Sequence, residues 1–598
     1  MLNAIAQKLN KSLTRAFPAA TTGGALLTPE KLASYLETPP DPTWGDFALP
    51  GFRLAQDLGL PPAEILARLK KALKPSAWLE KAEIRGPYLN LFLRAEFLAK
   101  NSVIPALKKS YGRARKTGQI IVVEFPSPNT NKPLHLGHLR NLAIGESYCR
   151  LLESNGYTAK RVNLNNDRGI HICKSMLAYK LYGKGITPKK AGKKSDHLIG
   201  DFYVLYNQKI KEHPELEQQA QDLLVAWENG DVKVRALWKK MNRWAFDGFK
   251  ATYKNFGIKH QKEYFESEIY TQGRDIVLKG LQDGIFQKRA DGAVVADLTP
   301  EGLEEKVLLR ADGTTVYMTQ DLYLAQIKER DFHPQGSVFV VGNEQGYHFK
   351  VLFNLLKKLK FPSAANLKHL AYGMVNLPEG RMKSREGNVV DADNLIDEVT
   401  ELARAEISGR YADLSADEIN ERARVIALAA IKYRLISVDI FKNIVFDPKE
   451  ALSFEGNTGT YLLYAYARAG SVLGKASGSV IPEDARQCGC PESVDKQIPA
   501  YAGMTSITLP TTMEISERVL ARTLGAWTET IQTALAHDNP ALIAHYAYDL
   551  AQNFNTFYHT CPILESTQRE WRVALTQAVR RTLGGALNIL NIETLEVM

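Results

Sequence analysis

The stretch Ser127–His138, SPNTNKPLHLGH, is the part of the sequence that decides the fold. It follows Ile120–Phe125, an almost continuous β-branched run of the kind that forms a strand buried on both faces of a parallel sheet. Apolar residues then recur at helical spacing up to Gly156, and residues 157–164 resemble a second strand. This order predicts a βαβ unit, with the quoted loop at the carboxyl edge of the sheet.

Two histidines of the loop, His135 and His138, stand about one helical turn apart around Gly137. Free backbone N–H groups at a helix start favour anions. We therefore expect both imidazoles to donate hydrogen bonds to phosphate oxygens, while Gly137 leaves room for adenine or ribose. The alternative is a pair of surface histidines or a loose metal pair, which the preceding strand and the presence of Asn129 and Lys132 disfavour.

The wider stretch SPNTNKPLHLGHLRN resembles the HIGH signature of class I aminoacyl-tRNA synthetases. Its Ser-Pro-Asn start, and Lys132 three residues before His135, are similar to the arginyl-tRNA synthetase version. The resemblance implies an arginine–tRNA ligase that makes arginyl-adenylate from L-arginine and ATP and transfers the arginyl group to the 2′-hydroxyl of the terminal adenosine of tRNA(Arg). It also implies that Mg²⁺ accompanies ATP and that the first step generally needs bound tRNA.

The resemblance covers nearly the whole chain and implies a multidomain α/β plus all-α protein. Residues 1–112 would form a small N-terminal α+β module that contacts the tRNA elbow. Residues 113–395 would form a Rossmann-like catalytic domain with a helical insertion at about 195–262, and residues 396–598 a helical anticodon-binding bundle. Residues 476–512 contain four prolines and no helical period, so we expect a long irregular loop there.

Composition fits a globular protein with several cores, because 45% of the 598 residues are hydrophobic and 24% are charged. The formal net charge of +10 favours a polyanionic partner, although many basic proteins bind no nucleic acid. The five cysteines are scattered and odd in number, so we expect reduced thiols. Only Cys488 and Cys490 are close together, and without a second pair at ligand spacing we expect no structural zinc.

No run of 18 apolar residues is present, so we expect no membrane span. The first 29 residues contain basic but no acidic side chains, a pattern that also fits an organellar transit peptide. However, Leu2, Ile5, Ala6, Leu9 and Leu13 fall on one helical face, which favours a folded amphipathic helix. We expect a cytoplasmic protein that acts as a monomer.

Two short motifs, Trp44–Phe47 and Gly86–Asn90, are similar to the N-terminal module of arginyl-tRNA synthetases, which contacts the tRNA elbow. Residues 82–93 are expected to form two short strands around a Gly-Pro turn. A helper domain without RNA contact is the alternative.

A second catalytic segment, Leu377–Val390, has the sequence LPEGRMKSREGNVV. It resembles the KMSKS loop of class I synthetases, with serine in place of the second lysine. The resemblance assigns catalysis to Arg381 and Lys383, and ATP binding to Met382 and Lys383. Loss of one such charge typically costs about 2.7–4 kcal/mol, and Lys132 is expected to supply the missing charge. An ordinary solvated basic turn is the alternative.

Recognition of arginine needs carboxylates and carbonyl oxygens that match the planar donors of a guanidinium. Tyr317 and Asp321 are four positions apart, which would place them on one face of a helix. A helix cap with a packed tyrosine ring is the alternative. The resemblance implies an arginine-binding set of Glu124, Asn129, Glu266, Tyr317, Asp321 and Gln345.

The helical last third contains a segment with several tyrosines and an arginine, residues 461–468. Aromatic rings and a guanidinium on one helix suit the stacking of unpaired bases, at about 1–3 kcal/mol per base. A tyrosine-rich bundle core is the simpler alternative. The segment resembles the start of the anticodon-binding domain of arginyl-tRNA synthetases, which selects Tyr461, Arg468 and Tyr558 as anticodon contacts.

Other functions fit the sequence less well. A cysteinyl enzyme would need a zinc site in its catalytic domain, a glutamyl enzyme is a further class I candidate, and a small HxGH nucleotidyltransferase would be much shorter. A non-catalytic tRNA-binding paralogue is a further alternative, which only the altered second motif supports. The intact histidines, Lys132, Tyr317, Asp321 and Gln345 argue against it.

Overall fold

A parallel sheet of five strands forms the centre of the structure, a computed structural model that describes residues 1–18, 27–378, 390–411, 413–478 and 507–597. The strand order is β11–β10–β4–β5–β6, and every pair is parallel. Helix α7, Leu136–Ser154, joins β4 to β5, so the predicted βαβ unit and Rossmann-like sheet are confirmed. The strands are β4 Ile120–Glu124, β5 Thr158–Asn165, β6 Lys262–Phe265, β10 Gly336–Gly342 and β11 Leu367–Tyr372.

The direction in which strands are added to the sheet reverses at β4. From β4 the chain continues to β5 and β6 on one side, and it later returns to place β10 and β11 on the other side. In open parallel sheets, ligands bind in the crevice beyond the carboxyl ends of the strands at such a reversal. The segments that follow β4 and β10 therefore meet at this crevice.

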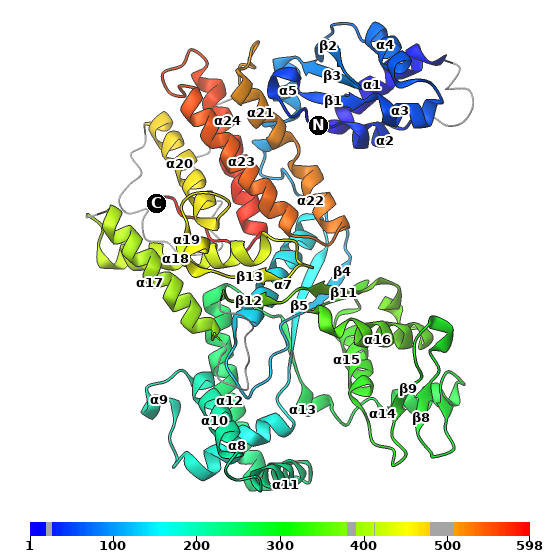
Figure 1. Cartoon of the computed structure of the whole chain (residues 1–598), viewed down its shortest axis with the longest axis vertical. Helices are drawn as coiled ribbons and strands as arrows, with labels where there is room; N and C mark the ends of the chain where they lie inside the picture. The colour runs from blue at the N-terminus through cyan, green and yellow to red at the C-terminus, as the bar shows by residue number, and fades with distance from the viewer. Residues whose placement is uncertain (19–26, 379–389, 412, 479–506, 598) are drawn as a thin grey trace.

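The last third of the chain is helical, and its helices pack side by side (Figure 1). The predicted α/β plus all-α class is thereby confirmed. Of the irregular loop predicted for residues 476–512, residues 479–506 lie outside the described part of the chain. The principal helices are α17 Ala392–Arg410, α18 Ala416–Ile436, α20 Gly459–Ser477, α21 Ile515–Gly525, α22 Trp527–Ala536, α23 Ala541–Thr560 and α24 Arg569–Ile589.

Helix α7 is buried on nearly all sides because it lies between the sheet and the helices α17, α18, α22 and α24. Its Arg140 is fully buried and donates to the backbone carbonyl oxygens of four residues, Gly373, Met374, Ile440 and Lys442. These carbonyls replace the water that a guanidinium would otherwise bind. One side chain thus ties α7 to the segments that follow β11 and α18.

Two further segments interrupt the sheet, and both lie in the lower half of Figure 1. The first separates β5 from β6 and is helical: α8 Ile170–Tyr182, α10 Ser195–Lys209, α11 Leu216–Glu228 and α12 Val232–Phe256. The second separates β6 from β10 and includes a small antiparallel sheet that sequence patterns did not indicate. Its elements are α14 Arg274–Gln282, β7 Gln287–Lys288, β8 Val294–Ala296, β9 Lys306–Leu309 and α15 Tyr317–Phe332, and α16 Gly346–Lys358 follows β10.

The N-terminal module, blue in Figure 1, has its own antiparallel sheet with the order β1–β3–β2. The Trp44–Phe47 motif docks this module against the helical bundle. Asp46 is buried, and its carboxylate accepts hydrogen bonds from the N–H of Leu93 at 2.7 Å and from Nε of Arg518 on α21 at 3.1 Å. The elements are α1 Leu2–Ala16, which buries the predicted apolar face, β1 Phe47–Pro50, β2 Leu79–Arg85 and β3 Tyr88–Leu93. Among the described helices, none has an apolar stretch of the length needed to cross a bilayer.

Candidate active site

His135 and His138 stand at the start of α7, beyond the carboxyl end of β4. His135 is the N-cap residue: its Nδ1 accepts from the N–H of Gly137 at 3.1 Å, and its own N–H donates to Nδ1 of His138 at 3.1 Å. The two ring centroids are 3.9 Å apart. The first turn of a helix leaves N–H groups without helical partners, and here imidazole nitrogens accept two hydrogen bonds at the helix start.

These contacts fix the protonation state of both rings. Because each Nδ1 accepts a hydrogen bond, the proton of each neutral ring lies on Nε2. Burial, with the charge of Lys132 as a smaller cause, lowers the pKa of His135 to about 3. Burial also holds the pKa of His138 well below its usual value. At neutral pH each ring therefore offers one uncharged Nε2–H donor.

Lys132 lies beside the two rings in the loop between β4 and α7. It is half buried, and burial lowers the pKa of its ammonium group. Its neighbours Asn131 and Pro133 are buried, which fixes the backbone at this position. The charge of Lys132 acts on both histidines, so the cation and the two donors belong to one site.

The described end of the second catalytic segment lies against the first motif. Residues 390–392 run antiparallel to residues 134–136, with backbone hydrogen bonds of 3.2 and 2.9 Å and a bridge between Asp391 and His135. Two motifs that are about 250 residues apart in the sequence thus meet. The predicted residues Arg381, Met382 and Lys383 lie outside the described residues.

Near the ends of β5 and β6, carboxyl groups from two other elements act on the carboxyl group of Glu266. Burial raises the pKa of Glu266 to about 7, with Asp167 and Asp321 adding to the rise and Arg168 opposing it. Burial also raises the pKa of Asp167 to about 6. Asp321, on α15, is partly exposed and lies 2.7 Å from Nε2 of His348 on α16. Such a concentration of carboxyl groups suits a guanidinium ligand.

Three other members of the predicted arginine-binding set are exposed. Tyr317 is the first residue of α15, one turn before Asp321, and 75% of it is exposed. Gln345 ends the short 3₁₀ helix after β10, and Asn129 lies in the loop after β4, where its backbone pairs with Asn166. Because β4 and β10 are neighbours, Asn129 and Gln345 both follow strands that end at the crevice.

Glu124, the remaining member, is buried and already paired within the protein. It is only 6% exposed and forms an ion pair with the buried Lys328 of α15, so its contact with arginine stays a prediction. The Lys328 ammonium group also lies 4.4 Å from the ring centroid of Phe339 on β10. The Glu124 side chain belongs to the packing between sheet and helix, and its charge is already neutralised. Sequence spacing did not reveal a partner 204 positions away.

The predicted anticodon residues gather on one face of the helical bundle. Arg468 lies between two tyrosine rings, with its guanidinium 4.5 Å from the centroid of Tyr464 and 4.8 Å from that of Tyr558. It donates to Oδ1 of Asn555 at 2.7 Å, and Nδ2 of Asn555 donates to the hydroxyl of Tyr461 at 2.8 Å. Arg468 and Tyr464 line two neighbouring hollows of about 670 and 910 Å³. The face therefore offers rings, a cation and space together.

Two residues near the predicted set were missed by sequence reasoning. His348, which contacts Asp321, lies only three positions after Gln345, so the helical period was a usable signal. The second is Asp167, in the turn after β5. Its carboxylate accepts from the N–H and the hydroxyl of Ser267 at 2.8 and 2.7 Å, beside Glu266.

Three family models match the chain. They are described as the arginyl tRNA synthetase N terminal domain over residues 3–93, the tRNA synthetases class I (R) catalytic domain over residues 102–448, and the DALR anticodon binding domain over residues 462–598. Together they span the N-terminal module, the sheet with its insertions and the helical bundle.

Curated relatives and solved structures agree with these models. The arginine–tRNA ligase of Treponema denticola is 43% identical over 574 residues, which is 94% of each chain, and that of Porphyromonas gingivalis is 45% identical over 86% of this chain and 87% of its own. The solved arginyl-tRNA synthetase of Thermus thermophilus is 28% identical and matches all of both chains with a TM-score of 0.78. The structure from Plasmodium falciparum, at 20% identity and a TM-score of 0.72, shares the fold.

Proposed function

The chain belongs to the class I arginyl-tRNA synthetase family, and from this membership and the site geometry we propose how its residues divide the work of charging tRNA with arginine. It is an arginine–tRNA ligase, which uses ATP to activate arginine and then esterifies tRNA. The observation that carries the residue assignment is the pair of neutral histidines at the point where the strand order of the sheet reverses.

In the activation step, the carboxylate of arginine attacks the α-phosphorus of ATP in line, and pyrophosphate leaves. The Nε2–H groups of His135 and His138 donate to the phosphate oxygens on which charge develops, and Lys132 supplies a positive charge beside them. ATP enters as its Mg²⁺ complex. Arginine-dependent exchange of labelled pyrophosphate into ATP, in the presence of tRNA, tests this step. The absence of this exchange would contradict it.

Arginine binds through the carboxyl groups around Asp321 and Glu266, with Asn129, Tyr317 and Gln345 along the same crevice. The guanidinium presents planar donors that carboxylates match with two parallel hydrogen bonds. Nε2 of His348 contacts the Asp321 carboxylate at 2.7 Å. The positive charge of the guanidinium thus compensates the carboxylates for the water that they lose when arginine binds.

Binding of arginine should release a proton near neutral pH. Burial raises the pKa of Glu266 to about 7, so this carboxyl is partly protonated at pH 6.5, while an adjacent guanidinium favours the ionised form. Affinity for arginine is therefore expected to rise between pH 6 and pH 8. Calorimetry at pH 6.5 in buffers of different ionisation enthalpy measures the released proton.

Glu266→Gln provides the control for this prediction, because the amide cannot titrate. The variant should bind arginine more weakly, and most of its pH dependence should disappear. The neighbouring Asp167 titrates at a lower pH, with a pKa of about 6, and accounts for any remainder. Proton release that is unchanged in Glu266→Gln would contradict the assignment.

Transfer to tRNA uses the 2′-hydroxyl of the terminal adenosine, which attacks the activated carbonyl of arginyl-adenylate; the ester forms as the bond to the phosphate breaks and AMP leaves. The anticodon loop is recognised on the face around Tyr461, Arg468 and Tyr558, and the N-terminal module contacts the tRNA elbow. The ion pair between Asp46 and Arg518 connects these two regions. Residues 1–112, 113–395 and 396–598 are the proposed functional units, and the enzyme is proposed to work as a cytoplasmic monomer.

Replacing Arg468 by alanine is expected to raise the KM for tRNA roughly 5- to 150-fold, since a stacked base contributes about 1–3 kcal/mol. The kcat at saturating tRNA should change little, because the site is remote from the histidines. Arg404→Ala on α17, where the guanidinium pairs with Glu401 and Asn420, is the matched control. An unchanged KM for tRNA in Arg468→Ala would remove this face from the RNA contact surface.

A further inference from the structure

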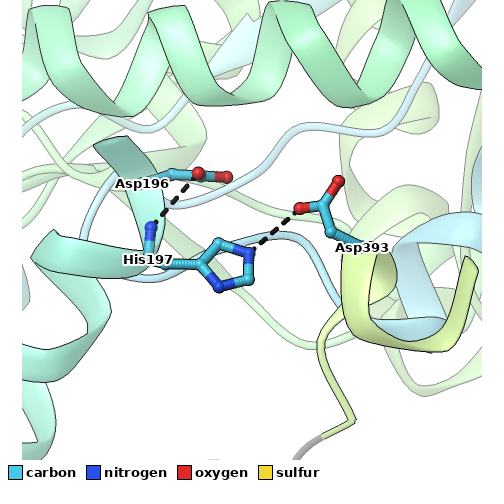
Figure 2. Close-up of side chains that lie close together, drawn as sticks. All are labelled: Asp196, His197 and Asp393. Atoms are coloured by element: carbon cyan, nitrogen blue, oxygen red, sulfur yellow. Dashed lines mark hydrogen bonds and ion pairs between the residues drawn. The ribbon is translucent and has the colours of Figure 1, made fainter. Parts of the chain in front are cut away.

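Two acidic side chains and an imidazole from two elements that are distant in the sequence meet in the structure (Figure 2). Asp196 and His197 lie in the first turn of α10, and Asp393 lies in the first turn of α17. Their ligand atoms lie within 4.8 Å of one another, a spacing that a metal ion would also require. Two carboxylates this close together need a cation to balance their charge.

The ammonium group of Lys194 already provides that charge. Its Nζ lies 2.7 Å from Oδ2 of Asp393, 3.1 Å from Oδ2 of Asp196 and 2.6 Å from the hydroxyl of Thr252 on α12. An ammonium group has three donors, and all three find an acceptor here. The cluster is therefore a charge-assisted hydrogen-bond network between α10, α12 and α17, and it needs no metal ion.

A glycine on α12 permits this close approach. A Cβ atom at Gly248 would lie 2.3 Å from the Asp196 carboxyl group and would clash with it. The hydroxyl of Thr252, one turn further along α12, donates to the other oxygen of Asp393 at 3.0 Å. Asp393 is thus held from the side of the insertion by two different helices.

The same segment is bonded on its other side to the first catalytic motif. Asp391 is bridged to His135, and residues 390 and 392 exchange backbone hydrogen bonds with residues 136 and 134. His197 reaches both carboxylates of the segment, with Nε2 3.0 Å from Asp393 and Nδ1 3.6 Å from Asp391. The segment 390–393 is therefore clamped between the insertion and the backbone on either side of His135.

A direct contact supports the same conclusion. Helix α10 packs so closely on the motif that a Cβ atom at Gly200 would lie 2.6 Å from Cδ of Pro133. Pro133 follows Lys132, the cation of the proposed phosphate site. The insertion thus braces the loop before His135 directly, and the helix start at His135 through Asp391 and Asp393.

We propose that Lys194 and His197 are positioning residues for adenylate formation. Through Asp391 and Asp393, they hold His135 and His138 at the angle that the phosphate requires. The proposal rests on the assignment of these histidines to ATP. Displacing a catalytic group by about 1 Å can lower the rate on the order of 100-fold. We therefore expect a measurable effect on the rate from a network that contacts the histidines only through the segment 390–393.

The test compares Lys194→Met with its neighbour Lys193→Met. Lys193 forms an exposed ion pair with Asp201 of α10, at 2.6 Å, and makes no described contact with Asp393, so it is a matched control. In arginine-dependent ATP–pyrophosphate exchange at saturating tRNA, Lys194→Met is expected to lower kcat about tenfold or more. The KM values for arginine and tRNA should stay within about twofold. Lys194→Arg should recover much of the loss, and Lys193→Met should match the wild type.

A second variant keeps the test decisive where Lys194→Met folds poorly. His197 is partly exposed, so His197→Ala should fold, as thermal melting would verify, and it should lower kcat roughly three- to tenfold with unchanged KM values. Wild-type kcat in both variants, or an equal loss in Lys193→Met, would overturn the proposal. The proposed function would still stand in that case if the wild-type enzyme charges tRNA with arginine and the His135→Ala variant loses this activity.

Discussion

Lys132→Ala is expected to lower kcat for arginyl-adenylate formation roughly 100- to 1,000-fold, the usual cost of removing one group that stabilises transition-state charge. The reason is the second motif, in which serine at position 384 replaces the second lysine of the KMSKS pattern. Lys132 stands beside both histidines, where its charge is felt by each ring. ATP–pyrophosphate exchange at saturating arginine and tRNA measures the effect.

Two further variants make this result specific. Lys132→Arg keeps the charge on a longer side chain and should recover part of the rate, because the contribution is electrostatic. Lys279→Ala, at an exposed position of α14, controls for a general loss of positive charge and should behave as the wild type. Exchange that survives Lys132→Ala undiminished would refute the idea that this lysine compensates for the serine.

Asp321→Ala is expected to raise the KM for arginine roughly 30-fold or more, since truncation of one partner in a desolvated charge pair costs about 2–5 kcal/mol. Asp321 is the carboxylate that His348 orients, at 2.7 Å, and it adds to the raised pKa of Glu266. The KM for ATP should change little. Steady-state charging at varied arginine gives both values.

His348→Gln is the companion variant for Asp321. It keeps a hydrogen-bond donor near the carboxylate, so a rise of only a few fold in the KM for arginine is expected. Asp331→Asn, near the other end of α15, should leave the KM for arginine unchanged, because Asp331 pairs with Lys262 and Arg330. An unaltered arginine KM in Asp321→Ala would show that another group receives the guanidinium.

Local pattern predicted those features that depend on neighbouring residues. The run before the first motif gave a strand, since β-branched residues fill a sheet buried on both faces, and β4 covers Ile120–Glu124. The spacing of Tyr317 and Asp321 placed both on α15. Leu2, Ile5 and Leu9 marked one face of a helix, which α1 confirms.

Features that depend on distant contacts did not follow from the sequence. Glu124 pairs with Lys328, 204 positions away, and no spacing rule marks such a partner. Both terminal NH2 groups of Arg140 donate to backbone carbonyls, four in all, an environment that only the folded chain creates. The link from Lys194 to Asp393 likewise joins positions 199 apart.

Charging of unfractionated tRNA with each of the 20 labelled amino acids tests the central claim most directly. The account predicts ester formation with arginine alone, dependent on ATP and abolished when the tRNA 2′-hydroxyl at the terminal adenosine is absent. Charging with another amino acid, or no charging with arginine by folded protein, would contradict it.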